Sequence, residues 1–199
     1  MRKVAASMFG LVAAIAASTA NAGVVTFTPA SRLVTPGTPA VFDLTVTAAD
    51  LGAFDGLGMD IGSDRAGLVM TFEYAPSFLS SATLTPPPPQ SYGTYASDLF
   101  VGGNRLVPLT NQDAWRAPLL IGTLTVQTAG MAQDSFFDIF VDGLRDRNQF
   151  GADLSSVGTS AGASELLQGS ARVSIVPEPA TLSLLGLGLV GLLRRRRTA

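Results

Sequence analysis

The sequence predicts an all-β body, folded as an antiparallel β-sandwich, with a short segment of different character at each end. Apolar and polar residues alternate over several short segments, as is typical of strands with one buried and one wet face. The chain holds 21 glycines and 12 prolines among 199 residues, which favours frequent turns. Because strong helical periods and β-α-β spacing are both missing, we expect packed antiparallel sheets.

The expected strands follow these alternating segments in chain order. Val24–Thr28 is the first, and in the second Phe42, Leu44 and Val46 alternate with polar residues. We expect a loop, or a single helical turn, at Ser164–Gln168. The remaining expected strands cover residues 68–74, 123–127, 137–141 and 173–175, and turns are expected at residues 36–37, 102–104 and 142–143.

A long surface loop or flap is expected over residues 84–111. The consecutive prolines Pro86–Pro89 favour polyproline II and cannot occupy a central strand. Tyr92 and Tyr95 follow, and with Trp115 they could form a surface for stacking on a sugar. The alternative for the lone tryptophan is a partly buried packing residue.

Residues 1–22 have the composition of a secretory signal peptide. Arg2 and Lys3 give a positive start, an uncharged alanine-rich run follows, and Ala20 and Ala22 fit an A-x-A cleavage site. A short N-terminal membrane anchor is the alternative, against which the small-residue cleavage site argues. We expect cleavage after Ala22, through the Sec translocon and signal peptidase, and therefore export.

The other end has three parts in order. Pro177-Glu178-Pro179 is followed by the uncharged stretch 180–193 and then by the cluster Arg194, Arg195, Arg196 and Arg197. As a helix, 14 residues span about 21 Å, short of a hydrocarbon core of about 30 Å. A buried core helix would not normally end in four arginines, whereas positive-inside topology and snorkelling suit a short transmembrane helix. We interpret this end as a temporary membrane stop.

This tripartite end resembles the PEP-CTERM protein-sorting signal of exported proteins in many Gram-negative, biofilm-forming bacteria. The resemblance covers residues 176–199 and implies that Pro177, Glu178 and Pro179 are recognised by an exosortase, a membrane-bound sorting enzyme. It also implies that Arg194–Arg197 orient the inner-membrane-anchored precursor before transfer to the cell surface or the extracellular space. The signal has also been called an ice-binding protein C-terminal domain, a label that concerns the tail alone.

Composition excludes several kinds of chemistry for the body, residues 23–176. The chain has no cysteine and no histidine, so imidazole or thiolate catalysis, zinc sites of those ligands and disulfides are all excluded. The body has seven basic and fourteen acidic residues, a net charge of about −7, which argues against a nucleic-acid partner.

The body also has a weaker resemblance to cohesin-like β-sandwich modules, which makes a cohesin-like or jelly-roll-like topology our expectation. Pro36-Gly37 precedes an alternating strand, residues 72–79 read FEYAPSFL, and a glycine-led strand starts at Gly122. Ala75 departs from this pattern, because cohesin-like modules usually have aspartate there. The resemblance is an analogy of fold and implies no function by itself.

Calcium is the one cofactor that the residues suggest. Asp142, Asp146, Asn148 and Asp153 partly match a calcium loop, although Phe150 replaces one oxygen ligand and the final glutamate is missing. The alternative is a wet turn in which Arg145 and Arg147 pair with nearby aspartates. Four further aspartates could also ligate calcium or act as solvated turn residues: Asp50, Asp55, Asp60 and Asp64.

These observations favour an exported structural, adhesive or binding component of the cell envelope or extracellular matrix, and not an enzyme. Its partner could be another matrix protein or an extracellular polysaccharide. The alternative is a carbohydrate-binding or hydrolytic module acting on that polysaccharide. Hydrolysis needs two carboxylates placed together, and the body has two glutamates, Glu73 and Glu165, besides its aspartates.

Overall fold

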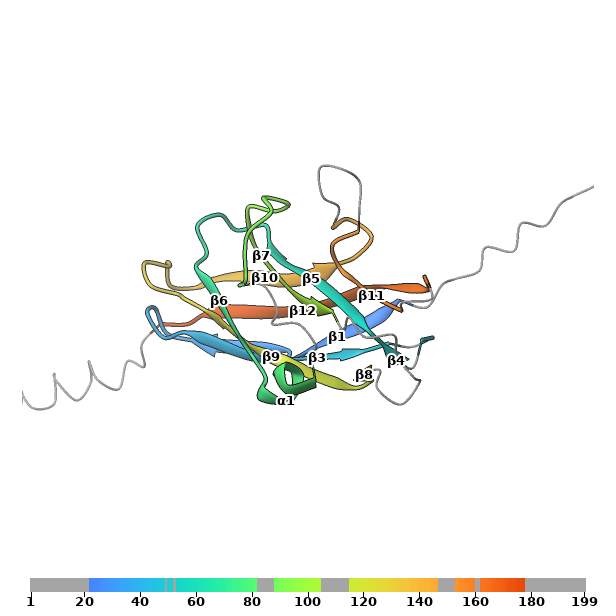
Figure 1. The fold of residues 1–199 in the computed structure, drawn as a ribbon. Coiled ribbons are helices and arrows are strands. Elements are labelled where there is room, and N and C mark those ends of the chain that lie inside the picture. The colour runs from blue at the N-terminus through green and yellow to red at the C-terminus, as the bar shows by residue number, and fades with distance from the viewer. Residues whose placement is uncertain are drawn as a thin grey trace, which may run out of the picture.

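The computed structural model describes residues 22–48, 50–51, 53–81, 88–104, 115–146, 153–159 and 162–177, and these residues form a β-sandwich (Figure 1). The elements are β1 (Gly23–Thr28), β2 (Ser31–Val34), β3 (Ala40–Thr47), β4 (Ala53–Phe54), β5 (Gly56–Ser63), β6 (Met70–Tyr74), α1 (Pro76–Ser81), β7 (Ser97–Asn104), β8 (Trp115–Arg116), β9 (Leu119–Val126), β10 (Ser135–Asp142), β11 (Ser156–Gly158) and β12 (Ser164–Ile175).

Two layers of strands face each other across the core. One layer contains β5 with β7 and β10 beside it, and the other runs β1-β3-β9-β6 (Figure 1). The long strand β12 connects them, because it pairs with β10 and β11 and also with β1 and β2. The short strands β4 and β8 pair with each other and form a separate two-stranded sheet.

The predicted antiparallel arrangement holds for most strand pairs, but not for all pairings of β12. β12 runs parallel to both β1 and β2, with Gly23 opposite Leu167 and Val34 opposite Ile175. The first and last strands of the described chain are therefore neighbours.

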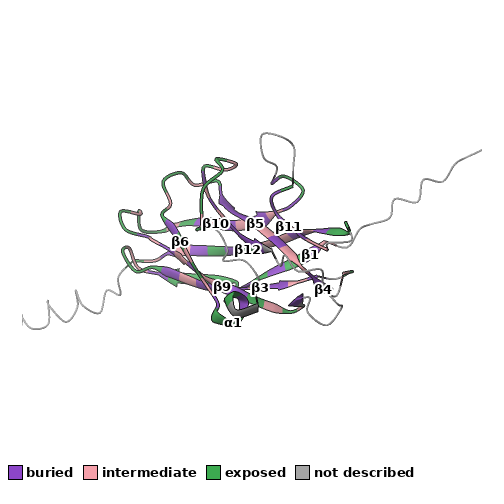
Figure 2. Cartoon of the chain, viewed as in Figure 1, coloured by how far each residue is buried: buried purple, intermediate pink, exposed green. Residues whose placement is uncertain are grey.

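Most of the strands predicted from alternation are confirmed. In β3, Phe42, Leu44 and Val46 are fully buried, and in β10 the predicted stripe Phe137, Ile139 and Val141 also faces the core. Figure 2 shows the buried positions of these strands alternating mostly with partly buried ones. Both layers contribute to one apolar cluster, so their burial supplies the main stabilising free energy of the fold.

Two predicted loops contain strands instead. Residues 97–104 form β7, paired over its whole length with β5, so the expected surface loop at 84–111 and the turn at residues 102–104 are wrong there. Ser164–Gln168 is the start of β12, and no helical turn forms there. In both places glycine or polar residues break the alternation, although the backbone is extended and fully paired.

Candidate functional site

The outer face of β5 is covered by aromatic side chains from residues 92–100. The Tyr95 ring lies on Gly62, where any β-carbon would collide with it, and Phe100 lies 3.3 Å from the position of a β-carbon on Gly58. Tyr95 also packs edge-on against Phe140, with ring centroids 4.8 Å apart. The segment is therefore fastened over this face by ring contacts that need glycine beneath them.

Asp60 lies on the same strand, between these two glycines, and is fully buried. Neither carboxylate oxygen has a hydrogen-bond partner of good geometry among the described residues. Burial raises the pKa of Asp60 to about 6. The side chain of Thr94 opposes the rise, whereas the negative charges of Asp98 and Asp146 increase it. The expectation of a solvated turn residue at this position is therefore wrong.

Asp146 holds three segments together beside Asp60. Its carboxylate accepts hydrogen bonds from the Tyr95 and Ser155 hydroxyls and from the Asp142 backbone N–H at 3.0 Å. Burial raises the pKa of Asp146, while the hydrogen bonds from Ser155, Tyr95 and Asp142 oppose that rise. Burial, followed by the hydrogen bond to Asp146, raises the pKa of Tyr95 as well.

These contacts bear on the predicted calcium loop. Asp142 and Asp153 belong to the described residues, as does Asp146, but Asn148 lies outside them. Within the described part of the chain, no group of three acidic side chains is placed to hold a metal ion. Arg145 pairs with Asp142 at 3.3 Å, as the alternative interpretation expects. Calcium binding stays a prediction. In this structure the Asp146 carboxylate accepts hydrogen bonds from hydroxyl and backbone N–H groups.

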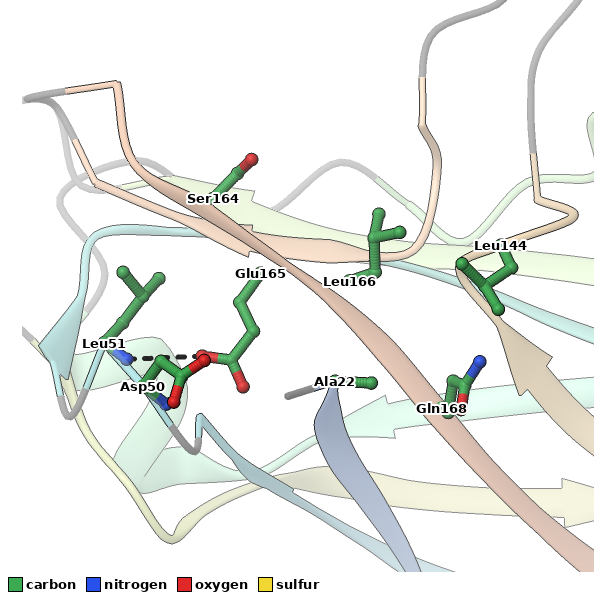
Figure 3. Close-up of a pocket in the computed structure, with 8 residues that line it drawn as sticks. All are labelled: Ala22, Asp50, Leu51, Leu144, Ser164, Glu165, Leu166 and Gln168. Atoms are coloured by element: carbon green, nitrogen blue, oxygen red, sulfur yellow. Dashed lines mark hydrogen bonds between the residues drawn. The ribbon is translucent and has the colours of Figure 1, made fainter. Parts of the chain in front are cut away.

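A second polar site lies at the start of β12, where Glu165 is only 6% exposed. Its Oε2 accepts the backbone N–H groups of Asp50 at 3.1 Å and Leu51 at 3.2 Å. Glu165 lines a cavity of about 300 Å³, and Ala22 lies in it at the entrance to β1 (Figure 3). Leu144, Ser164, Leu166 and Gln168 complete the lining.

The other residues considered for carbohydrate chemistry are separated. Glu73 is exposed on β6, whereas Glu165 is buried on β12. Trp115 is only 3% exposed and stacks on Phe78, with centroids 4.8 Å apart, so the packing interpretation is confirmed. Tyr92 remains 48% exposed beside Phe100.

The predicted sorting segment starts directly after the last strand. β12 ends at Ile175, the Val176 N–H donates to the Val34 carbonyl at 2.8 Å, and Pro177 is exposed. Ala20, Glu178, Pro179 and Arg194–Arg197 lie outside the described residues. Among the residues that are described, no helix is long and apolar enough to span a membrane.

Sequence reasoning missed the burial of Asp60 and Glu165. One signal for Asp60 was present, because Gly56, Gly58 and Gly62 occupy every second position around it. Glycines on one face of a strand mark a close approach by other groups, here the rings of Tyr95 and Phe100. No comparable local signal marks Glu165.

Comparison with known proteins identifies the terminal motif. Residues 176–197 match the PEP-CTERM protein-sorting motif, in agreement with the resemblance of the Pro-Glu-Pro, apolar and arginine parts. No curated protein sequence matches the chain.

Solved structures of cohesins resemble the body. A chain of a type I cohesin–dockerin complex from Clostridium thermocellum superposes with a TM-score of 0.55 at 9% identity, over 78% of this chain and 100% of that one. The sixth cohesin of scaffoldin B from Acetivibrio cellulolyticus, in complex with a dockerin, gives 0.54 at 10% identity, over 78% and 99%. The seventh ScaB type I cohesin from Pseudobacteroides cellulosolvens gives 0.50 at 7% identity, over 79% and 94%. The chain thus carries a PEP-CTERM protein-sorting motif behind a body with the β-sandwich fold of cohesin modules.

Proposed function

We propose that this protein is an exported exosortase substrate whose body acts by binding another protein in the cell envelope or extracellular matrix. The observation that carries the proposal is the direct succession of a cohesin-like sandwich and a PEP-CTERM motif, with only Val176 between β12 and Pro177. A stable acidic body delivered to the surface needs no catalytic group for such a role.

The positions of the acidic groups support binding over hydrolysis. A glycosidase needs two carboxylates across one sugar ring, about 5–10 Å apart. Glu165 is engaged with the backbone of Asp50 and Leu51 beneath β12, and Glu73 lies exposed on β6. We therefore propose that the protein is not an enzyme.

An exposed row across β2, β12 and β10 is the proposed docking surface for the protein partner. Leu33 and Phe136 both lie opposite Ser174, so the three side chains share one face of the sheet. Leu33 is 74% exposed and Phe136 is 62% exposed. Arg172 lies over the Phe136 ring at 4.7 Å and pairs with Asp138 at 2.7 Å. Aromatic and arginine side chains of this kind are enriched at protein interfaces.

Replacing Phe136 with serine should abolish retention of the partner without changing the fold, because the side chain is exposed. We would compare wild-type and F136S bodies immobilised on beads against envelope extracts of the native host. Val69→Ser removes an equally exposed apolar side chain, 59% accessible, away from this row and is the matched control. Equal retention of the same host protein by both variants would place the docking surface elsewhere.

The sorting role has its own test in the native host. Replacing Pro177, Glu178 and Pro179 together by alanine should leave the uncleaved precursor in the inner membrane, because the recognition motif is lost while the apolar stretch and arginines remain. Intact mass of the protein from membrane and extracellular fractions measures this. Replacing Thr198 and Ala199 together by serine, beyond the arginine cluster, is the control. Unchanged processing of the alanine variant would refute the sorting role.

A saccharide ligand is the second candidate, and the exposed ring of Tyr92 beside Phe100 favours it. Stacking of a sugar face on an aromatic ring is a common mode of weak carbohydrate recognition. A glycan array probed with the wild type and with Tyr92→Ala separates the two proposals, since only saccharide binding depends on this side chain.

A further inference from the structure

The Glu165 cavity lies where the predicted signal peptide ends. Ala22 lines this cavity, and the next residue, Gly23, is buried as the first residue of β1 (Figure 3). Gly23 lies opposite Leu167 in the parallel pairing of β1 with β12. Cleavage after Ala22 would therefore create the new chain end beside a buried carboxylate.

The surroundings of Gly23 contain two oxygen acceptors. A β-carbon built on Gly23 would lie 3.2 Å from Glu165 Oε1, 3.2 Å from the Thr47 carbonyl oxygen and 2.8 Å from Leu167 Cδ2. The Gly23 nitrogen is bonded to the same α-carbon, so it lies within about 6 Å of both oxygens, a range in which opposite charges change each other's pKa.

We propose that signal-peptide removal turns the Gly23 nitrogen into an α-ammonium group that pairs with the Glu165 carboxylate and fastens β1 to β12. Signal peptidase hydrolyses the Ala22–Gly23 amide bond. Water supplies the hydroxyl to the Ala22 carbonyl carbon and a hydrogen to the Gly23 nitrogen, which binds one more proton at neutral pH. The resulting group has three donors, and Glu165 Oε1 and the Thr47 carbonyl are acceptors within its reach.

The charges around the cavity favour a cation. Its titratable lining side chains are Glu165 on β12 and Asp50 in the turn after β3, and both are acidic. The N–H groups of Asp50 and Leu51 hold Glu165 Oε2 and so fix the orientation of the carboxylate. The precursor has only a neutral amide at Gly23, so the ion pair belongs to the mature chain. This inference goes beyond the proposed function and rests on the predicted cleavage site.

The test uses the chain from Gly23 to Ala199 in detergent, released from a cleavable fusion so that Gly23 is the first residue. The pKa of the α-amine, followed through the Gly23 Cα chemical shift, should lie about 1 unit or more above its ordinary value of about 7.7–8.0. Acetylation of the amine should lower Tm at pH 7 by about 2–4 °C. Because the folded-state pKa is the higher one, this extra stability is complete below about pH 7.7 and is lost as pH rises through the folded-state pKa.

Glu165→Gln keeps an acceptor for the two N–H groups but removes the charge, so it should return the amine pKa to its ordinary value and abolish the effect of acetylation. Glu73→Gln, at an exposed position on β6, is the matched control and should leave both unchanged. An unshifted amine in the wild type, or equal Tm with and without acetylation, overturns the proposal even if Glu165→Gln does not fold. An intact mass from the host that shows a first residue other than Gly23 also overturns it, independently of the Pro177–Pro179 result.

Discussion

Phe78→Ala should lower the free energy of unfolding by about 3–5 kcal/mol, the range for truncating a buried aromatic side chain. Phe78 is fully buried on α1 and stacks between Tyr74 and Trp115, with centroid distances of 5.6 and 4.8 Å. Trp115 in turn packs against Phe54, at 5.8 Å, so the ring of Phe78 links the short pair β4–β8 to the main sheet. Its loss opens a cavity that this small sub-structure cannot fill.

Urea denaturation followed by tryptophan fluorescence measures this effect, since Trp115 is the only tryptophan of the chain. Leu79→Ala provides the comparison, because Leu79 is the next residue of the same helix and is 42% exposed. We expect it to cost less than about 1 kcal/mol. Similar losses for the two variants would mean that α1 does not pack as described.

Asp60→Asn should stabilise the protein by about 1–2 kcal/mol above pH 6 and should not stabilise it at pH 3. The folded-state pKa of Asp60 is about 6, against an ordinary 3.8, and the largest cause is burial. One pKa unit corresponds to about 1.4 kcal/mol, and relaxation of the protein around the buried charge makes the expected gain smaller than the full value. The amide of asparagine has a similar shape and carries no charge to desolvate.

The sign of this pH dependence follows from proton linkage. Between pH 3.8 and about 6 the unfolded chain releases the Asp60 proton while the folded chain retains it, so stability falls as pH rises. Above about pH 6 the penalty is constant. The difference in stability between Asp60→Asn and the wild type should therefore grow over this window and then level off.

Asp138→Asn supplies a control of opposite sign. The hydrogen bond from Arg172 lowers the pKa of the partly exposed Asp138, so its carboxylate favours folding above its unfolded pKa. This contribution is lost as pH falls through the folded-state pKa. We expect Asp138→Asn to destabilise slightly at neutral pH. Chemical denaturation from pH 3 to pH 8 measures both variants, and a flat difference curve for Asp60→Asn would contradict the burial of its charge.

The sequence could predict those strands whose two faces differ in polarity. Phe42, Leu44 and Val46 in β3 face the core while Asp43 and Thr45 face water, so alternation is visible without a structure. β5 does not show this pattern, because its outer face holds three glycines and the buried Asp60. The rings of Tyr95 and Phe100 cover this face. The amino-acid composition of β5 therefore resembles that of an acidic, glycine-rich turn.

Long-range contacts account for what sequence reasoning missed in the candidate sites. Gly102 is typical of a turn, but its lack of a side chain lets β7 lie against the Leu57 carbonyl of β5. Leu57 is distant from Gly102 in the sequence, so this contact is not visible locally. Glu165 has the local sequence of a loop residue, yet its carboxylate accepts hydrogen bonds from the N–H groups of Asp50 and Leu51, more than a hundred positions away. The terminal sorting motif was recognisable because its three parts are contiguous and need no fold.

The parallel pairing of β1 with β12 has a consequence for the timing of export. β1 can gain its neighbour on that side only after residues up to 168 have been synthesised and moved across the membrane, and β2 must wait for Ile175. Sheets that depend on such distant pairings form slowly, because the closure of a long loop comes before the contacts that reward it. The strand pairing of the body can therefore be complete only when the chain up to Ile175 has been exported, directly before the sorting motif that begins at residue 176.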